Sequence, residues 1–179
     1  MSHTIRRFRP ADADAMLAFA KGLPEHDLLF LGRDLRHPRV IEAWLAAIEE
    51  GWIDSLVAED DDDRTIVGTA ALVRDPLGWS THVGEVRLLV DAEHRGAGLG
   101  RDLVEALFAC AARHDLAKLS ARMTPDQQAS VALFEGLGFR AEALLRDEVR
   151  DRAGTSHDLA ILSLDLARHA ARADAYGVD

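Results

Sequence analysis

The sequence has 179 residues, 48% of them hydrophobic and 29% charged, which is ordinary for one soluble globular domain. Its formal net charge of −10 argues against a nucleic-acid partner, because the phosphates would be repelled unless a strong local basic patch were present. It contains no apolar run long enough to span a bilayer, no signal-peptide core at its start and one cysteine, Cys110, which excludes an intramolecular disulfide and a metal cluster of cysteines. We therefore expect a cytoplasmic protein with no membrane partner.

The first part of the chain predicts a strand and two helices. Residues 4–8 form a short apolar–polar strand, and residues 11–23 carry apolar side chains at helical spacing. Residues 24–37 are mixed in character and predict a loop or a short helix. Pro38 suits the first position of a second helix, which Gly51 is placed to end.

Two further strands are predicted at residues 54–59 and 65–74, joined by a tip that contains four successive aspartates. Four carboxylates in a row could suggest a metal site. The tip lacks the glycine and the terminal glutamate of a calcium-binding loop, so a solvated hairpin tip is expected and no metal is predicted.

The centre of the chain combines a strand, a glycine-rich turn and a helix. Residues 83–91 are mostly apolar and β-branched, residues 95–100 read RGAGLG, and from Leu99 onward apolar residues recur on one helical face that includes Cys110. A strand that enters a helix through glycines leaves unpaired backbone N–H groups at the positive end of the helix, an arrangement suited to a phosphate. Glycine is needed because a side chain would hold the anion away from the backbone.

Two common phosphate-binding motifs do not fit this turn. A P-loop requires a lysine after its last glycine, and none follows Gly100. A dinucleotide-binding fingerprint that starts at Gly96 would need its third glycine where Arg101 stands. The pattern that remains is Arg-x-x-Gly-x-Gly after a strand of the form Glu-x-x-x-x-Val.

The last part of the chain predicts a strand at residues 118–123, a helix and two more strands. Residues 124–127 read TPDQ, a capping box with proline at the first helical position, and Gly138 is placed to end the helix. Strands follow at residues 141–150 and 157–166, and residues 167–179 form a polar tail.

The central turn and the later segment SVALFEGLGF, residues 130–139, together resemble the GNAT-type N-acetyltransferases. The predicted element order, β-α-α-β-β-β-α-β-α-β-β, matches that fold along almost the whole chain. The expected architecture is α/β (α+β): one domain over residues 4–166, with a mixed central sheet of about seven strands flanked by about four helices. One parallel pairing is expected, because a strand–helix–strand unit spans residues 83–123.

The resemblance implies acetyl-CoA as co-substrate and an amine as acceptor, and the acidic charge favours a cationic amine. The backbone of Leu88, Leu89 and Val90 would pair with the pantetheine arm, and the Val90 N–H would polarise the thioester carbonyl. The pyrophosphate would lie on the turn, which also supplies two arginines, although Arg101 could equally sit on a solvated face. The residues of this turn are Arg95, Gly96, Ala97, Gly98, Leu99, Gly100 and Arg101.

Three residues carry expectations that the resemblance leaves open. Glu85 is the candidate general base, and the alternative is a salt bridge with Arg87 or with a neighbouring strand. Gln127 stands where the family usually has an asparagine that contacts the coenzyme arm, but the capping box also accounts for it. Cys110 is expected to be a buried structural thiol and not a nucleophile.

Phe134 departs from the family pattern, because many members have a tyrosine there that protonates the leaving thiolate. The chain's one tyrosine, Tyr176, lies in the C-terminal tail. Phe134 would then pack against the coenzyme while water protonates the thiolate, or the protein would bind acyl-CoA as a regulatory domain with little or no turnover. A third alternative is a catalyst that uses a bulkier acyl-CoA.

The acceptor amine has no readable motif. By the resemblance, residues 24–37 and 146–157 shape its site, and the pair His157–Asp158 is a candidate element of it. A small molecule and a protein N-terminus or lysine both remain open as acceptors. Monomer and homodimer remain open as well.

Overall fold

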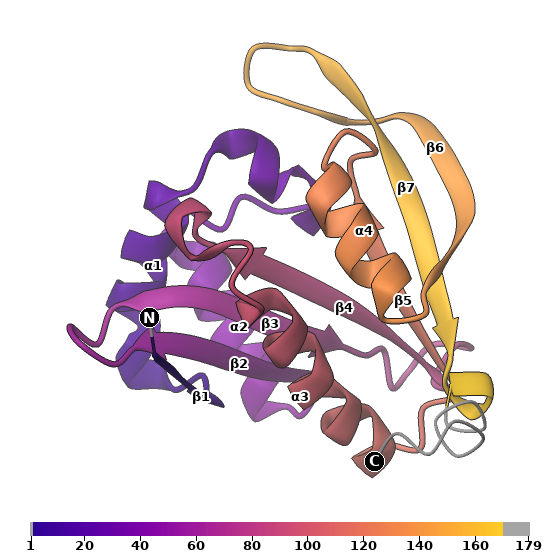
Figure 1. Ribbon diagram of the computed structural model, residues 1–179, viewed down its shortest axis with the longest axis horizontal. Helices are drawn as coiled ribbons and strands as arrows, with labels where there is room; N and C mark the ends of the chain where they lie inside the picture. Colours follow the sequence, from indigo (N-terminus) through magenta and orange to yellow (C-terminus); the bar gives the residue numbers. More distant parts are fainter. Residues whose placement is uncertain (1, 170–179) are drawn as a thin grey trace.

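The computed structural model describes residues 2–169, which form one seven-stranded sheet with helices on both faces (Figure 1). The strands are β1 His3–Arg7, β2 Ile53–Asp60, β3 Ile66–Val73, β4 Val83–Val90, β5 Lys118–Met123, β6 Arg140–Arg150 and β7 Ser156–Asp165. The α-helices are α1 Ala13–Gly22, α2 Pro38–Glu49, α3 Leu99–Arg113 and α4 Gln128–Gly136. Three 3₁₀ helices accompany them: η1 Pro10–Asp12, η2 Glu25–Leu31 and η3 Ala92–His94.

The strands are ordered β1-β2-β3-β4-β5-β7-β6. Neighbours pair antiparallel except β4 and β5, which pair parallel across the connection made by α3. The mixed sheet, its strand number and its parallel pair confirm the architecture expected from the sequence. That all the strands belong to one sheet supports the proposal of one domain over residues 4–166.

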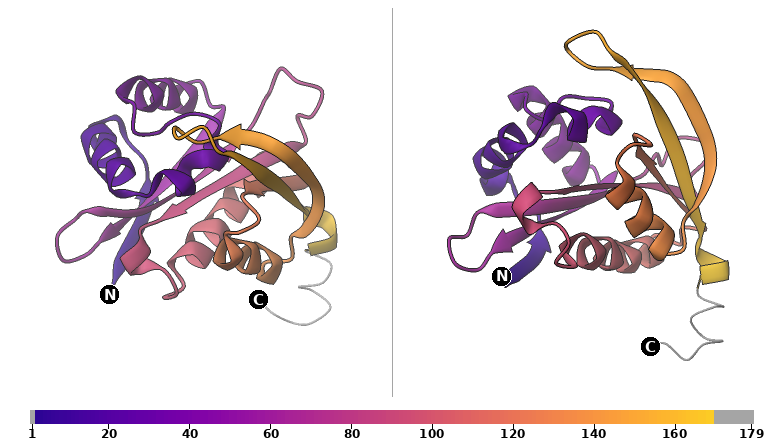
Figure 2. Two further views of the ribbon diagram at one scale, coloured as in Figure 1. Left: turned by 90° about the horizontal axis from the view of Figure 1, so that it is seen from above. Right: turned by 45° about the horizontal axis from the view of Figure 1, so that its top comes forward.

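Alternate residues of the central strands feed two hydrophobic cores, one on each face of the sheet (Figure 2). Val86 belongs to the core beneath α3 and α4, whereas Leu89 belongs to the core beneath α1, α2 and η2. Cys110 lies in the first of these cores with its side chain buried, as expected. Helices therefore cover both faces of the central strands.

The parallel pairing of β4 with β5 stops halfway along β4. The paired residues run from Val83 with Lys118 to Val86 with Ala121, and beyond them β5 continues to pair with β7 alone. Leu88, Leu89 and Val90 therefore keep β3 on one side and have no strand partner on the other. The sheet is open at this point.

Two local predictions differ from the structure. Helix α4 begins at Gln128, and its N-cap residue is Gln127, whose side chain makes no capping hydrogen bond. The capping box predicted over residues 124–127 is therefore wrong. Thr124 is instead buried, and its hydroxyl faces the ring of His26, 98 residues away. Residues 11–23, predicted as one helix, begin with the 3₁₀ turn η1, and α1 starts at Ala13.

Residues 170–179, which hold most of the predicted tail and Tyr176, lie outside the described part of the chain. Within residues 2–169 no helix is both long and apolar enough to cross a membrane. The same residues contain no group of three or more histidine, cysteine, aspartate or glutamate side chains that could hold a metal ion.

Candidate functional site

A cavity of about 740 Å³ opens where β4 and β5 separate, bordered by the first turns of α3 and α4. Many of the residues predicted for the site line it. They are Leu88, Leu89, Val90, Arg95, Gly96, Gly98, Gly100, Arg101, Gln127 and Phe134. Ala97 is exposed but does not line the cavity, and the side chain of Leu99 is buried in the core beneath α3.

The main chain of β4 presents hydrogen-bonding groups to the opening. The N–H of Asp91 donates to the Val67 carbonyl on β3 at 2.9 Å. Because amide directions alternate along a strand, the N–H groups of Leu88 and Val90 point the other way, toward the gap beside β5. The Val90 N–H therefore has the direction that the resemblance requires of a donor to a thioester oxygen.

The glycine turn has the conformation and the space that an anion needs. Gly96 and Gly98 have φ angles of +78° and +93°, and a Cβ atom at either position would meet nothing within 4 Å. Gly98 is the N-cap of α3, and its carbonyl accepts from the N–H of Asp102. The N–H groups of Leu99, Gly100 and Arg101 precede that first helical bond, so they are free to bind a phosphate.

The two arginines of the turn differ in their surroundings. Arg95 donates from Nε and Nη2 to the Val90 carbonyl at 3.0 and 2.9 Å, and from Nη2 to Asp27 at 2.7 Å. It therefore joins η2 to the open end of β4. Arg101 forms one long contact of 3.4 Å with Glu105, one turn further along α3, and its side chain lines the cavity.

Helix α4 contributes a second helix N-terminus to the same cavity, through Gln127, Gln128 and Ser130. Its Phe134 is 3% exposed, lines the cavity and packs edge-on against Phe139 with ring centroids 5.0 Å apart. The amide of Gln127 lies 3.4 Å from Asp27. Phe134 thus occupies the position of a packing residue, as expected from its side chain.

Glu85 is held in an ion-pair cluster and is not among the residues that line the cavity. Its Oε1 accepts from Arg87 Nε at 2.7 Å, and its Oε2 lies 3.6 Å from Nε of Arg122 on β5. Both carboxylate oxygens therefore already face guanidinium groups. The structure contains the salt bridge that the sequence offered as the alternative, and the general-base role stays a prediction.

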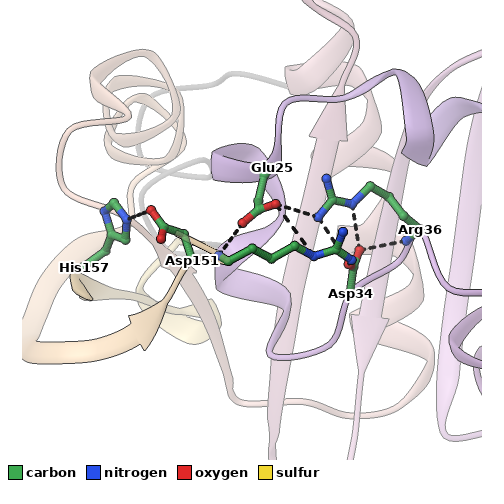
Figure 3. Close-up of polar contacts among 6 residues, drawn as sticks. Glu25, Asp34, Arg36, Asp151 and His157 are labelled. Carbon is green, nitrogen blue, oxygen red and sulfur yellow. Dashed lines mark hydrogen bonds and ion pairs between the residues drawn. The ribbon is translucent and has the colours of Figure 1, made fainter. Parts of the chain in front are cut away.

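The segments expected to shape the acceptor site lie side by side. The β6–β7 hairpin arches past α4 toward η2 (Figures 1 and 2), and its turn is bound there by an ion-pair network (Figure 3). The backbone N–H of Arg152 donates to Glu25 at 2.7 Å, and the Arg152 guanidinium binds Asp34. Arg36 binds the same two carboxylates at 2.9 to 3.0 Å, and this side-chain bond from Arg36 is the main reason that the pKa of Asp34 is lowered to about 2.

Several lining residues were missed from the sequence. Asp27 and Phe30 belong to η2, which was predicted only as a loop or short helix, and Asp126 lies in the supposed capping box. Their side chains reach the cavity through contacts across 68 to 100 positions of sequence, which no local pattern reveals.

A known protein family matches the part of the chain that contains the cavity and the glycine turn. The profile of the Acetyltransferase (GNAT) family matches residues 23–139, which run from the end of α1 to the start of β6. The chain belongs to the GNAT acetyltransferase family. The match includes the glycine turn, β4 and α4, which together form the cavity.

Individual relatives agree with this assignment. The mycothiol acetyltransferase of Kocuria rhizophila is 32% identical over 114 residues, which cover 58% of this chain and 38% of that protein. The chain thus matches less than half the length of this curated relative.

Solved structures share the GNAT fold at lower identity. An N-acetyltransferase from Staphylococcus aureus Mu50 superposes with a TM-score of 0.79 at 21% identity, over 93% of this chain and 99% of that one. A Salmonella typhimurium protein solved with its cofactor acetyl-CoA gives 0.76 at 24% identity, over 93% and 95%. The spermidine N-acetyltransferase of Vibrio cholerae, solved with CoA and spermine, gives 0.76 at 17% identity, over 93% and 97%.

Proposed function

We propose that this GNAT protein transfers an acetyl group from acetyl-CoA to a primary amine, by direct attack within a ternary complex. The observation that carries the proposal is the continuity of the cavity. It runs from the open edge of β4, where a pantetheine arm can pair with the backbone, to the glycine turn at the start of α3, where a pyrophosphate can bind. The family membership and the acetyl-CoA complex of the Salmonella relative support the same reading.

In the proposed reaction, the protein binds the coenzyme and polarises the thioester, and it forms no covalent bond to the acetyl group. The N–H of Val90, directed into the gap, would donate to the thioester oxygen as negative charge develops there. The N–H groups of Leu99, Gly100 and Arg101 would hold the pyrophosphate, with Arg95 and Arg101 adding positive charge that a protein of net charge −10 must provide locally. The attacking nitrogen forms a bond to the acyl carbon as the carbon–sulfur bond breaks.

Phe134 supplies no proton to the departing sulfur, so a water molecule would protonate the thiolate. This feature favours one alternative function, an acyl-CoA-binding domain with little turnover. We place it second because the family whose model matches residues 23–139 is a family of acetyltransferases.

The acceptor is proposed to be cationic, and a small molecule and a protein N-terminus or lysine both fit this description. Support comes from the acidic composition of the chain and from a relative whose name gives spermidine as its substrate. These two observations bear on the charge of the acceptor and do not distinguish a small molecule from a protein.

The experiment is a measurement of free thiol released from acetyl-CoA in the presence of polyamines, amino acids, small amines and peptides with free N-termini. The proposal predicts amine-dependent release that follows Michaelis–Menten behaviour with at least one class. Tight binding of acetyl-CoA by calorimetry, combined with no release across all four classes, would favour the binding-domain alternative.

A further inference from the structure

A cluster of titratable side chains lies beside the cavity, where η2, the β6–β7 hairpin and the loop before α4 meet. His26, on η2, directs its Nε2 atom to the Asp126 carboxylate, with distances of 3.1 and 3.0 Å to the two oxygens. The same Nε2 lies 3.1 Å from the hydroxyl of Thr124. The cluster thus joins η2 to the loop between β5 and α4, two segments that are about 100 positions apart in the sequence.

A second histidine completes the cluster. The ring of His157, on β7, meets the His26 ring edge-on with centroids 5.2 Å apart. His157 points its own Nε2 to Asp151 in the hairpin turn, at 3.0 Å (Figure 3). The cluster therefore receives one side chain or more from each segment that was expected to shape the acceptor site.

The contacts of His26 define its tautomer. An ionised carboxylate only accepts hydrogen bonds, so the Nε2 atom that faces Asp126 must carry the proton of the neutral ring. The pKa of Asp126 is lowered by the Thr124 hydroxyl first and by the His26 ring second, which keeps this carboxylate ionised at neutral pH. The Nδ1 atom of His26 is then left with a lone pair and can accept a proton.

His26 adjoins the cavity on two sides. Its hydrogen-bond partner Asp126 and its sequence neighbour Asp27 both line the cavity, and its own side chain is 34% exposed. Asp27 is bound to Arg95, and Glu25 is bound to Arg36 and to Arg152. Asp27 and Glu25 are thus already neutralised by arginines. Asp126 is the nearby carboxylate whose negative charge can stabilise the positive charge that His26 gains with a proton.

We propose that His26 is a catalytic residue that accepts the proton of the acceptor amine, with Asp126 and Thr124 as positioning residues. This inference rests on the proposed acetyl transfer. An ammonium nitrogen gives one proton to Nδ1, directly or through one water, and becomes the neutral amine that attacks the acyl carbon. The imidazolium then lies against the Asp126 carboxylate, in the arrangement by which a carboxylate orients and stabilises a histidine base. The attacking nitrogen loses its second proton to water as the amide forms, and water gives a proton to the thiolate that is released when the carbon–sulfur bond breaks. The imidazolium then gives its proton to solvent.

His26 suits this role better than the other candidates do. Neither Glu85 nor His26 is among the cavity-lining residues, but both oxygens of Glu85 face arginines, whereas the hydrogen bonds of His26 use Nε2 and leave Nδ1 available. His157 is engaged with Asp151, which does not line the cavity. His26 is the histidine whose carboxylate partner is itself a wall of the site.

The test compares kcat/KM as a function of pH for the wild type, His26→Gln and His114→Gln, with an amine that the wild type acetylates. His114 is a matched control, because it also pairs with an aspartate, Asp54, at 2.8 Å, is 30% exposed and lies at the far end of α3. We expect the wild-type kcat/KM to rise from acidic toward neutral pH, because only a neutral imidazole can accept the proton of the amine. His26→Gln should lose this rise and about 10²-fold in kcat, and its residual rate should increase at high pH as the amine deprotonates unaided.

Two further readouts separate a proton-transfer role from a structural one. Affinity for acetyl-CoA, measured by calorimetry, should be unchanged in His26→Gln, since none of the residues proposed to bind the coenzyme is a hydrogen-bond partner of His26. Added imidazole should partly restore the rate of His26→Ala, whereas it should not affect His114→Gln.

A wild-type profile that is flat from acidic to neutral pH would overturn the inference even if the variants failed to fold, because it requires no mutation. It would also be overturned by a folded His26→Gln variant with the wild-type rate and profile. Loss of the rise in Glu85→Gln in place of His26→Gln would return the base role to Glu85. If the wild type acetylates no amine at all, the proposed function fails together with this inference, and that result is distinct from the others.

Discussion

Phe134 is the residue at which this chain departs most clearly from the family pattern, and it is buried against Phe139 in the cavity wall. We predict measurable wild-type turnover, raised or left unchanged in Phe134→Tyr. The added hydroxyl could protonate the thiolate, while the ring keeps its packing and acetyl-CoA affinity changes little. An unpaired buried hydroxyl would cost ~1–3 kcal/mol of stability, which thermal unfolding would register.

The measurement is the rate at which the wild type and Phe134→Tyr release free thiol from acetyl-CoA in the presence of an amine. If the wild type and Phe134→Tyr bind acetyl-CoA equally well and neither releases thiol with any amine, then the missing acid is not what limits the protein, and the binding-domain alternative gains.

Single residues also show the limit of prediction from sequence. The glycine turn could be read from the sequence because it is a local pattern, and Gly96 and Gly98 have positive φ angles, while the role of the turn in binding coenzyme A stays a prediction. Thr124 was predicted to cap α4 and does not, because its hydroxyl contacts His26. The competing partner is 98 residues away, so no local pattern could have revealed it.

At the scale of elements, ion pairs hold the turn of the β6–β7 hairpin beside η2, where we propose that the acceptor binds (Figure 3). Arg152→Ala removes the guanidinium that binds Asp34 and keeps the backbone bond to Glu25. We expect a two- to fivefold rise in KM for the amine, equivalent to ~0.5–1 kcal/mol for an exposed pair, and no change in acetyl-CoA affinity. Steady-state kinetics with each substrate varied in turn measures both.

The matched control is Arg140→Ala. Arg140 begins the same hairpin at the end far from its turn, and its guanidinium donates to backbone carbonyls and not to a carboxylate, so its removal should alter neither KM. Equal effects of the two substitutions would show that general charge, and not the position of the hairpin, controls acceptor binding.

The elements themselves were largely predictable. Strands β2 to β5 and helices α2 and α3 follow from periodicity and from proline and glycine at their ends, which are local signals. The short 3₁₀ helix η2 agrees with the loop or short helix predicted at residues 24–37, but its contacts could not be predicted, because they involve distant partners, such as Arg95 for Asp27 and Arg152 for Glu25. This segment contains much of what is new in the candidate site.

At the scale of the whole molecule, stability toward acid should depend on carboxylates whose pKa values are lowered by arginines. Arg6 binds Asp12 at 2.7 Å and also binds Glu59, and these bonds lower the pKa of both carboxyl groups, while Arg36 lowers that of Asp34 to about 2. A group whose pKa is lower in the folded state stabilises the fold above its unfolded pKa. That stabilisation is lost as the pH falls through the folded value.

We therefore predict that the midpoint temperature of thermal unfolding, followed by circular dichroism, decreases as the pH is lowered from ~4 to ~2. Arg6→Gln should lower stability at pH 7 by ~2 kcal/mol and flatten this fall, because Asp12 and the nearly buried Glu59 lose their main partner. Arg64→Gln is the control, since Arg64 also binds Glu59 but is 65% exposed, and it should have little effect. A wild-type midpoint that is constant over this pH range would contradict the prediction.

The account as a whole requires the glycine turn at the start of α3 to hold the pyrophosphate of acetyl-CoA, and calorimetry of Gly98→Glu tests this most directly. The new carboxylate would lie where the anion should bind, at a φ of +93° with open space around it. Gly51→Glu provides the control, because Gly51 has a φ of +77° and equal space but lies after α2, away from the cavity. Both variants should lose ~1–2 kcal/mol of stability from the backbone strain and keep the fold. We predict that Gly98→Glu loses measurable acetyl-CoA binding while Gly51→Glu retains wild-type affinity; equal affinities in the two folded variants would contradict the site.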